Sequence, residues 1–340
     1  MELTFAFLIT VIAIYALFGG ADFGGGLLEA TLGRHPALQK KLQATLSPVW
    51  EANHVWLIAV VVIMFVGFPK VYTTMCTVLY LPLSLALLGI LLRGSFFTFR
   101  KYDPDPGKNL KTYDVVFRVS SVLTPTFFGF MVAATLAYLP QQSTHPDFGY
   151  AQLYLHPWLT VMGGLCAIFV NAVFGYLASV FFYGELDTEP DRRVMIRRIL
   201  YFFLATFVSG GAVLIWGALH LLVDPEKFFS AFQIMAQLVA FAAIVWMVVS
   251  LKNGRGWQAR FAAGLQTLAF LTGWVHMDYP VFFRFDDGTA LTVQNAAAPP
   301  ITIFWLNIGL VIVLSLVVPL LVYLYRVFQS SPDAKGLLRR

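Results

Sequence analysis

Charged side chains are scarce in this chain. Asp, Glu, Lys and Arg make up 12% of the 340 residues, whereas they make up about 25% of an average soluble domain. Hydrophobic residues make up 59%, and the mean hydropathy is +0.74. Apolar runs long enough to cross a bilayer recur along the whole sequence. This composition excludes a soluble enzyme and predicts an all-α polytopic membrane protein.

Cysteines and metal-ligand motifs are also scarce. Cys76 and Cys166 lie inside apolar runs and form neither a CxxC pair nor a disulfide framework. The sequence contains no CxxCH motif, no HExxH motif and no pair of histidines four residues apart. We therefore expect no metal site. We interpret His220 and His276, near the outer ends of two apolar runs, as hydrogen-bonded residues and not as haem ligands.

A basic surface for nucleic acid is missing as well. The formal net charge is +5, but Lys and Arg occur in short clusters between apolar runs and not in a stripe with interleaved aromatic residues. We interpret this excess as membrane topology and expect no nucleic-acid partner.

Nine apolar runs, separated by Pro, Gly and charged residues, predict nine transmembrane helices in a single integral membrane domain, residues 1–340. Each run is long enough to cross a hydrocarbon core of about 30 Å. The expected helices cover residues 3–28, 49–67, 71–92, 114–139, 158–183, 198–222, 228–251, 257–279 and 301–325.

The positive charges predict an orientation. With nine spans, all but Lys70, Lys227 and Arg284 of the 23 Lys and Arg residues fall on one side of the membrane. Because positive residues are retained in the cytoplasm, we expect the N-terminus outside and the C-terminus in the cytoplasm.

The end of the first run contains an acid among glycines, Gly19-Gly20-Ala21-Asp22-Phe23-Gly24-Gly25-Gly26. Gly20 and Gly24 form a GxxxG pair, which allows a neighbouring backbone to approach closely and leaves Asp22 facing protein. A carboxylate at membrane depth is costly and often marks a proton pathway. Two interpretations remain open, a packing motif with a hydrogen-bonded Asp22 and a proton-transfer group.

A second polar cluster opens the second run, Trp50-Glu51-Ala52-Asn53-His54-Val55-Trp56. Helical spacing places Glu51 and His54 on one face. The cluster fits an interfacial belt of Trp with Glu at a helix start, and it equally fits a proton-carrying Glu51. Further along, we interpret Arg93, Asp114 and Arg118 as snorkelling arginines and a loop-edge ion pair.

Together these residues resemble subunit II of the bacterial cytochrome bd quinol oxidases. The match rests on the glycine-rich segment, on Ser47 to Leu57, on Phe68-Pro69-Lys70-Val71-Tyr72, on Leu92-Arg93 ending the third helix and on Asp114 opening the fourth. It covers about the first third of the chain. The Glu-Ala-Asn-His version is similar to the cyanide-insensitive branch of the family.

The resemblance implies two four-helix bundles plus a ninth helix in the bacterial inner membrane, paired with a larger subunit I. That partner would hold two b-type haems and one d-type haem, and no haem would be ligated by this chain, His54 included. The complex would oxidise quinol at the outer face and reduce dioxygen to water with cytoplasmic protons. Membrane lipids and quinone are expected to be in contact with it, and the resemblance also allows a small single-span accessory subunit.

The resemblance further implies roles for individual residues. Glu51 and Asp22 are proton-path candidates, and Trp56 is an oxygen-path candidate. The supporting polar cluster would consist of Trp50, Asn53, His54, Arg93 and Asp114. Two departures stand out, because many members have Asp-Gly at Glu51-Ala52, and some have a second acid where this chain has Phe18.

Two alternatives to this role remain open at the sequence level. One is a secondary transporter that uses Asp22 and Glu51 as coupling carboxylates, although such proteins often show repeats and helices interrupted at mid-membrane. The other is a purely structural scaffold for the haem subunit, in which Glu51 could be replaced without effect on turnover.

Overall fold

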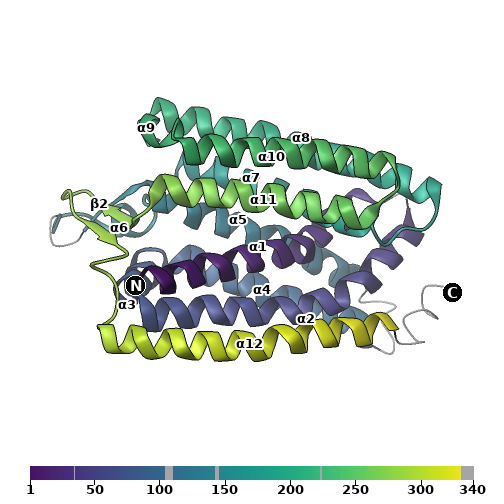
Figure 1. Ribbon diagram of the computed structural model, residues 1–340, viewed down its shortest axis with the longest axis horizontal. Coiled ribbons are helices and arrows are strands. Elements are labelled where there is room, and N and C mark those ends of the chain that lie inside the picture. The colour runs from purple at the N-terminus through teal and green to yellow at the C-terminus, as the bar shows by residue number, and fades with distance from the viewer. Residues whose placement is uncertain (34, 104–109, 142–144, 223, 331–340) are drawn as a thin grey trace.

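The computed structural model describes the whole chain apart from residues 34, 104–109, 142–144, 223 and 331–340. The side chains of residues 46–52 and 321–330 also lie outside the description. Long helices lie side by side along one axis (Figure 1). The long helices are α1 (Glu2–Thr31), α2 (Pro36–Gly67), α4 (Tyr80–Tyr102), α5 (Leu110–Leu136), α7 (Val161–Tyr183), α8 (Glu189–Leu219), α10 (Ala231–Lys252), α11 (Gly256–Asp278) and α12 (Pro300–Ser330). The short ones are α3 (Pro69–Val78), α6 (Tyr150–Tyr154) and α9 (Pro225–Phe228).

The long helices agree with a protein that crosses the membrane many times. Among the described residues, seven helices are long and apolar enough to cross a membrane, namely α1, α4, α5, α7, α8, α10 and α12 as far as Leu320. The second half of α2 and α3 meet at an angle of 113° and together could form an eighth span. Helix α11 has 23 residues, which is long enough for a span. It also carries Gln258, Arg260 and Gln266, which make it too polar to be counted with the seven helices above.

The third predicted span, 71–92, is wrong in its bounds. The chain forms α3 up to Val78 and then the separate helix α4 up to Tyr102. Pro82 explains the break, because it has no N–H to donate to the carbonyl of Val78 and its ring clashes there. Arg93 therefore lies inside α4 and does not end a helix.

Helix α1 lies at the centre of the molecule. It packs against α2, α5 and α7, while α4 pairs with α5, α7 with α8, and α10 with α11. A Cβ atom on Gly24 would lie 1.9 Å from the carbonyl oxygen of Phe174 on α7, and one on Gly20 would lie 2.5 Å from Leu177. The predicted close approach at the GxxxG pair is thus confirmed.

A small sheet, which the sequence did not predict, covers the end of the molecule where α1 begins (Figure 1). Strand β2 (Val281–Phe285) pairs in parallel with β1 (Tyr138–Leu139) and antiparallel with β3 (Ala290–Thr292). In the β2–β3 turn, hydrogen bonds from the Thr289 hydroxyl and backbone N–H lower the pKa of Asp287. The Asp287 carboxylate therefore stays ionised, which suits a turn in contact with water.

Candidate functional site

Buried charges gather between α1, α4 and α5. Asp22 and Glu29 lie seven residues apart on α1, and Arg93 and Arg100 lie seven residues apart on α4. Seven residues are about two helical turns, so each pair shares one helix face. The acids of α1 meet the arginines of α4 at two levels.

The deeper level is the ion pair between Asp22 and Arg93. Asp22 Oδ1 lies 2.7 Å from Arg93 Nη1, and each side chain is 1% exposed. Arg93 also donates through Nη2 to the main-chain oxygen of Asp22 at 2.6 Å and through Nε to Ser121 Oγ at 3.1 Å. Its guanidinium lies over the rings of Phe23 and Phe117. These contacts fix both charges in one geometry.

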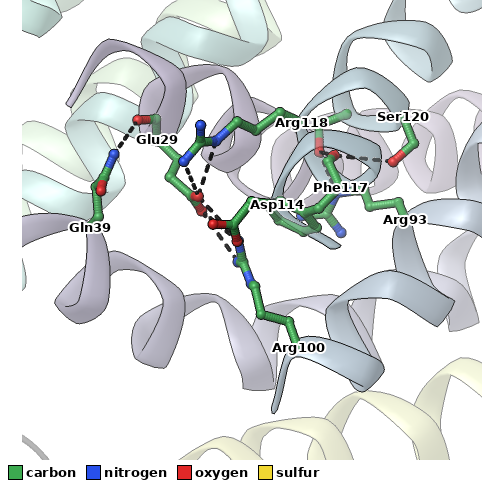
Figure 2. Close-up of polar contacts among 9 residues, drawn as sticks. Glu29, Gln39, Arg93, Arg100, Asp114, Phe117, Arg118 and Ser120 are labelled. Atoms are coloured by element: carbon green, nitrogen blue, oxygen red, sulfur yellow. Dashed lines mark hydrogen bonds and ion pairs between the residues drawn. The ribbon is translucent and has the colours of Figure 1, made fainter. Parts of the chain in front are cut away.

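The second level is centred on Glu29, which is fully buried. Its carboxylate accepts hydrogen bonds from Arg100 at 3.1 Å and from Arg118 of α5 at 3.1 Å. Arg100 also pairs with Asp114 at 3.0 Å, and Gln39 of α2 donates to the main-chain oxygen of Glu29. Figure 2 shows this network, which ties four helices together.

The structure brings some of the predicted site residues together. Asn53 of α2 is 1% exposed, its amide lies next to Gly19, and Asn53 and His54 are both near enough to Asp22 to interact with it electrostatically. Trp50 and Glu51 belong to α2, but their side chains lie outside the described residues.

Two other predicted residues lie elsewhere. Asp114 belongs to the Glu29 network and does not contact the Asp22 pair. Trp56 is 4% exposed and packs in a core cluster with Leu8 and Ile63, so its ring is enclosed by the protein.

An open groove lies along α4, and His54 is the residue of α2 in its described lining. It has a volume of about 590 Å³. Its walls are formed by His54, Leu87, Ile90, Leu91, Gly94, Ser95, Thr98 and Phe99. His54 thus lies at the groove while its neighbour Asn53 points to Asp22.

Sequence analysis missed Glu29 and Arg100. The signal that could have found them is the seven-residue spacing from Asp22 and Arg93. The interpretation of Arg93 as a snorkelling residue is wrong, because α4 continues nine residues beyond it and keeps it enclosed by α1 and α5. A loop-edge ion pair does exist, and it joins Asp114 to Arg100.

Histidines and acids do not gather into a metal site anywhere in the part of the chain that the structure describes. His220 Nδ1 lies 2.9 Å from the carbonyl oxygen of Trp216, and its ring stacks on that of Trp216. His276 Nε2 lies 3.1 Å from Ser230 Oγ. The interpretation of both as hydrogen-bonded residues is confirmed.

The fold is that of a bd oxidase chain. A similar solved structure is described as "The structure of bd oxidase from Geobacillus thermodenitrificans", with a TM-score of 0.76 over 96% of this chain and 99% of that one. The two sequences are 20% identical, so this likeness concerns the fold alone.

The family model for cytochrome bd terminal oxidase subunit II matches residues 1–328, and the chain belongs to this family. A relative named cytochrome bd ubiquinol oxidase subunit 2, from Bacillus subtilis, is 25% identical over 93% of this chain and 92% of its own length. The cytochrome bd-I ubiquinol oxidase subunit 2 of Escherichia coli is 27% identical over 34% of this chain and 30% of its own length.

The chain is therefore a subunit of a quinol oxidase complex and a multi-pass protein of the bacterial inner membrane. The resemblance drawn from the sequence is confirmed, and the alternative of a stand-alone transporter is not supported.

Proposed function

We propose that this chain is the haem-free subunit of the oxidase and that it delivers cytoplasmic protons to a haem-bearing subunit I. In this proposal subunit I holds two haems b and one haem d, and a small single-span subunit can join the complex. The contacts of His220 and His276 within the chain support the assignment of the haems to the partner. The observation that carries the proposal is the groove along α4.

The lining of this groove suits a protein partner better than lipid. Half of the lining consists of large apolar side chains, and Gly94, Ser95 and Thr98 lie together among them on this face of α4. Small and hydroxylated residues are typical of helix–helix contacts in membranes, and an imidazole such as that of His54 is costly beside lipid. We assign the groove to the contact with subunit I.

The spacing on α2 connects this contact with Glu51. Glu51 precedes His54 by three residues, so both lie on one face of the helix about one turn apart. We assign the proton-carrying role to Glu51. Asp22, which Arg93 holds at 2.7 Å, is assigned a positioning role as a fixed negative charge behind Asn53.

The finer architecture belongs to the same proposal. One four-helix bundle would consist of α1, α2, α4 and α5, and the other of α7, α8, α10 and α11, with α12 as the ninth span. The contacts of α4 with α5, α7 with α8, and α10 with α11 support this division. The end with the sheet would face outward, and the oxygen path would pass near Trp56.

The test replaces Glu51 in the complete oxidase. Glu51→Gln keeps the volume but cannot release a proton, so assembly and the haem spectrum should survive while quinol-dependent oxygen uptake falls, by about 100-fold or more if no water substitutes. Glu51→Asp should retain most of the uptake. The matched control is Asp187→Asn, since Asp187 is an exposed carboxylate paired with Lys41, and it should leave uptake unchanged.

A fully assembled Glu51→Gln oxidase with wild-type uptake across the neutral pH range would refute proton delivery through Glu51. The chain would then be a scaffold for the haem subunit.

A further inference from the structure

The hairpin of α10 and α11 carries only positive charge around its tip, because its one acid, Asp278, lies at the far end of α11. The sequence contains no Asp or Glu from Lys227 to Met277. Lys252 and Arg255 lie at the tip of the hairpin, and both are exposed. Within the described part of the chain, neither has a carboxylate within ion-pair distance. The tip is therefore a positive surface that its own hairpin does not neutralise.

Aromatic side chains lie directly beside this tip. Trp257 is 71% exposed, Phe261 55% and Trp246 36%. The rings of Trp257 and Phe261 stack at 5.8 Å, and the rings of Phe261 and Trp246 lie 5.5 Å apart. The three rings form one continuous aromatic surface across α10 and α11. Tryptophan at such a position is typical of the level of lipid headgroups.

Helix α8 adds further positive charge. Arg192 Nη1 lies close to Gly254 in the hairpin turn, so the start of α8 lies alongside the tip. Its neighbours Arg193 and Arg197 are exposed on one face of α8.

Most acids near the start of α8 already form ion pairs. Glu185 pairs with Arg260, Asp187 with Lys41 and Glu189 with Arg192. Asp191 is the remaining acid between residues 185 and 191. The exposed cations in this region are Arg193, Arg197, Lys252 and Arg255.

We propose that the tip of the α10–α11 hairpin binds an anionic phospholipid. Lys252 and Arg255 contact the phosphate of the headgroup, and an acyl chain packs on the surface formed by Trp246, Trp257 and Phe261. Clustered Lys and Arg at the membrane surface attract anionic lipid by about 1 kcal/mol each, which is about a fivefold change in affinity.

The position of the hairpin suits a lipid. Figure 1 shows α8 and α10 along one edge of the molecule and α12 along the opposite edge, with α2 beside α12. The tip lies at the end of the bundle away from the sheet. Lipid bound there does not compete with a partner in the groove along α4, so this inference does not depend on the proposed function.

The test measures lipid binding to the intact oxidase in neutral detergent. Phosphatidylglycerol with brominated acyl chains is titrated in, and quenching of tryptophan fluorescence gives the midpoint. We expect quenching at lower concentration than with brominated phosphatidylcholine. The variant with both Lys252→Gln and Arg255→Gln should shift the phosphatidylglycerol midpoint by about 30-fold. Changing Trp246 and Trp257 to Phe should remove the part of the signal that belongs to this site.

The matched control is a variant with Lys40→Gln and Lys111→Gln, which removes the same charge from other exposed positions. It should leave the midpoint unchanged. Equal quenching by the two lipids, or equal shifts in the two variants, would refute a specific site. Inorganic phosphate should not compete, and competition by it would show that the tip recognises a free anion and not a lipid.

Discussion

At the scale of single residues, the Asp22–Arg93 pair has the largest energetic consequence. Each charge is removed from water, which costs several kcal/mol per ion unless its partner compensates. Arg93 supplies part of this compensation, because it contacts the carboxylate, the main chain of α1 and Ser121. Removing one partner leaves the other charge buried alone.

We therefore expect Arg93→Met to destabilise the subunit by about 3–5 kcal/mol. The measurement is the thermal unfolding midpoint of the purified oxidase, together with the amount that assembles. The control is Arg118→Gln, because Arg118 is 34% exposed and Glu29 keeps Arg100. Its cost should be about 1 kcal/mol or less.

A double variant separates charge from packing. Asp22→Leu combined with Arg93→Met removes both charges and keeps the site filled, so most of the stability lost in the single variant should return. If the double variant is as unstable as the single one, the hydrogen bonds to Ser121 and to the main chain hold the helices, and not the ion pair.

At the scale of helices, the contact between α1 and α7 depends on the absence of a side chain at Gly24. A Cβ atom there would overlap the carbonyl oxygen of Phe174, and a backbone atom cannot move without shifting α7. Gly24→Ala should cost about 1–3 kcal/mol, as overpacking does in other cores, and should lower the thermal midpoint of the oxidase.

The matched control for this contact is Gly164→Ala on α7, where a Cβ atom would have no neighbour within 4 Å. This change should be neutral or slightly stabilising, since Ala favours helix. Equal destabilisation by the two changes would show that the close approach of α1 and α7 contributes little.

At the scale of the whole molecule, the orientation in the membrane can be tested directly. A reporter that works only outside the cytoplasm should be active when it is inserted at Gly288, in the β2–β3 turn. A reporter that works only in the cytoplasm should be active when it is fused after Arg340. Gly288 suits the insertion because it has no neighbour near its Cβ position. Two reporters on the same side would refute a membrane crossing by α12, which lies between them.

The sequence was informative where a single residue type carries the signal. Asp22 stood out because an acid is costly at membrane depth. The GxxxG pair predicted the close approach of a neighbouring helix, which is α7, because small residues allow such contacts. Pro82 also indicated the break before α4. The residues on both sides of it are mostly apolar, however, and the run was therefore predicted to be one span.

Pairing between distant helices could not be predicted in the same way. Nothing local shows that Arg93 turns inward or that Glu29 meets Arg100, since each depends on how α1, α4 and α5 are rotated. The groove depends on the same rotations, because its walls come from two helices. The sheet was missed because β1 has two residues and pairs with a strand far along the chain.

The central position of α1 also has a consequence for biosynthesis. Arg93 follows Asp22 by 71 residues, so at about 5–20 residues per second the ribosome needs roughly 4–14 s to supply the counter-charge. The partner surface on α7 is made later still. During this interval α1 has an acid without its counter-charge and a glycine face without its partner helix. Substitutions that weaken α4 should therefore reduce the yield of newly made subunit even when the finished oxidase tolerates them.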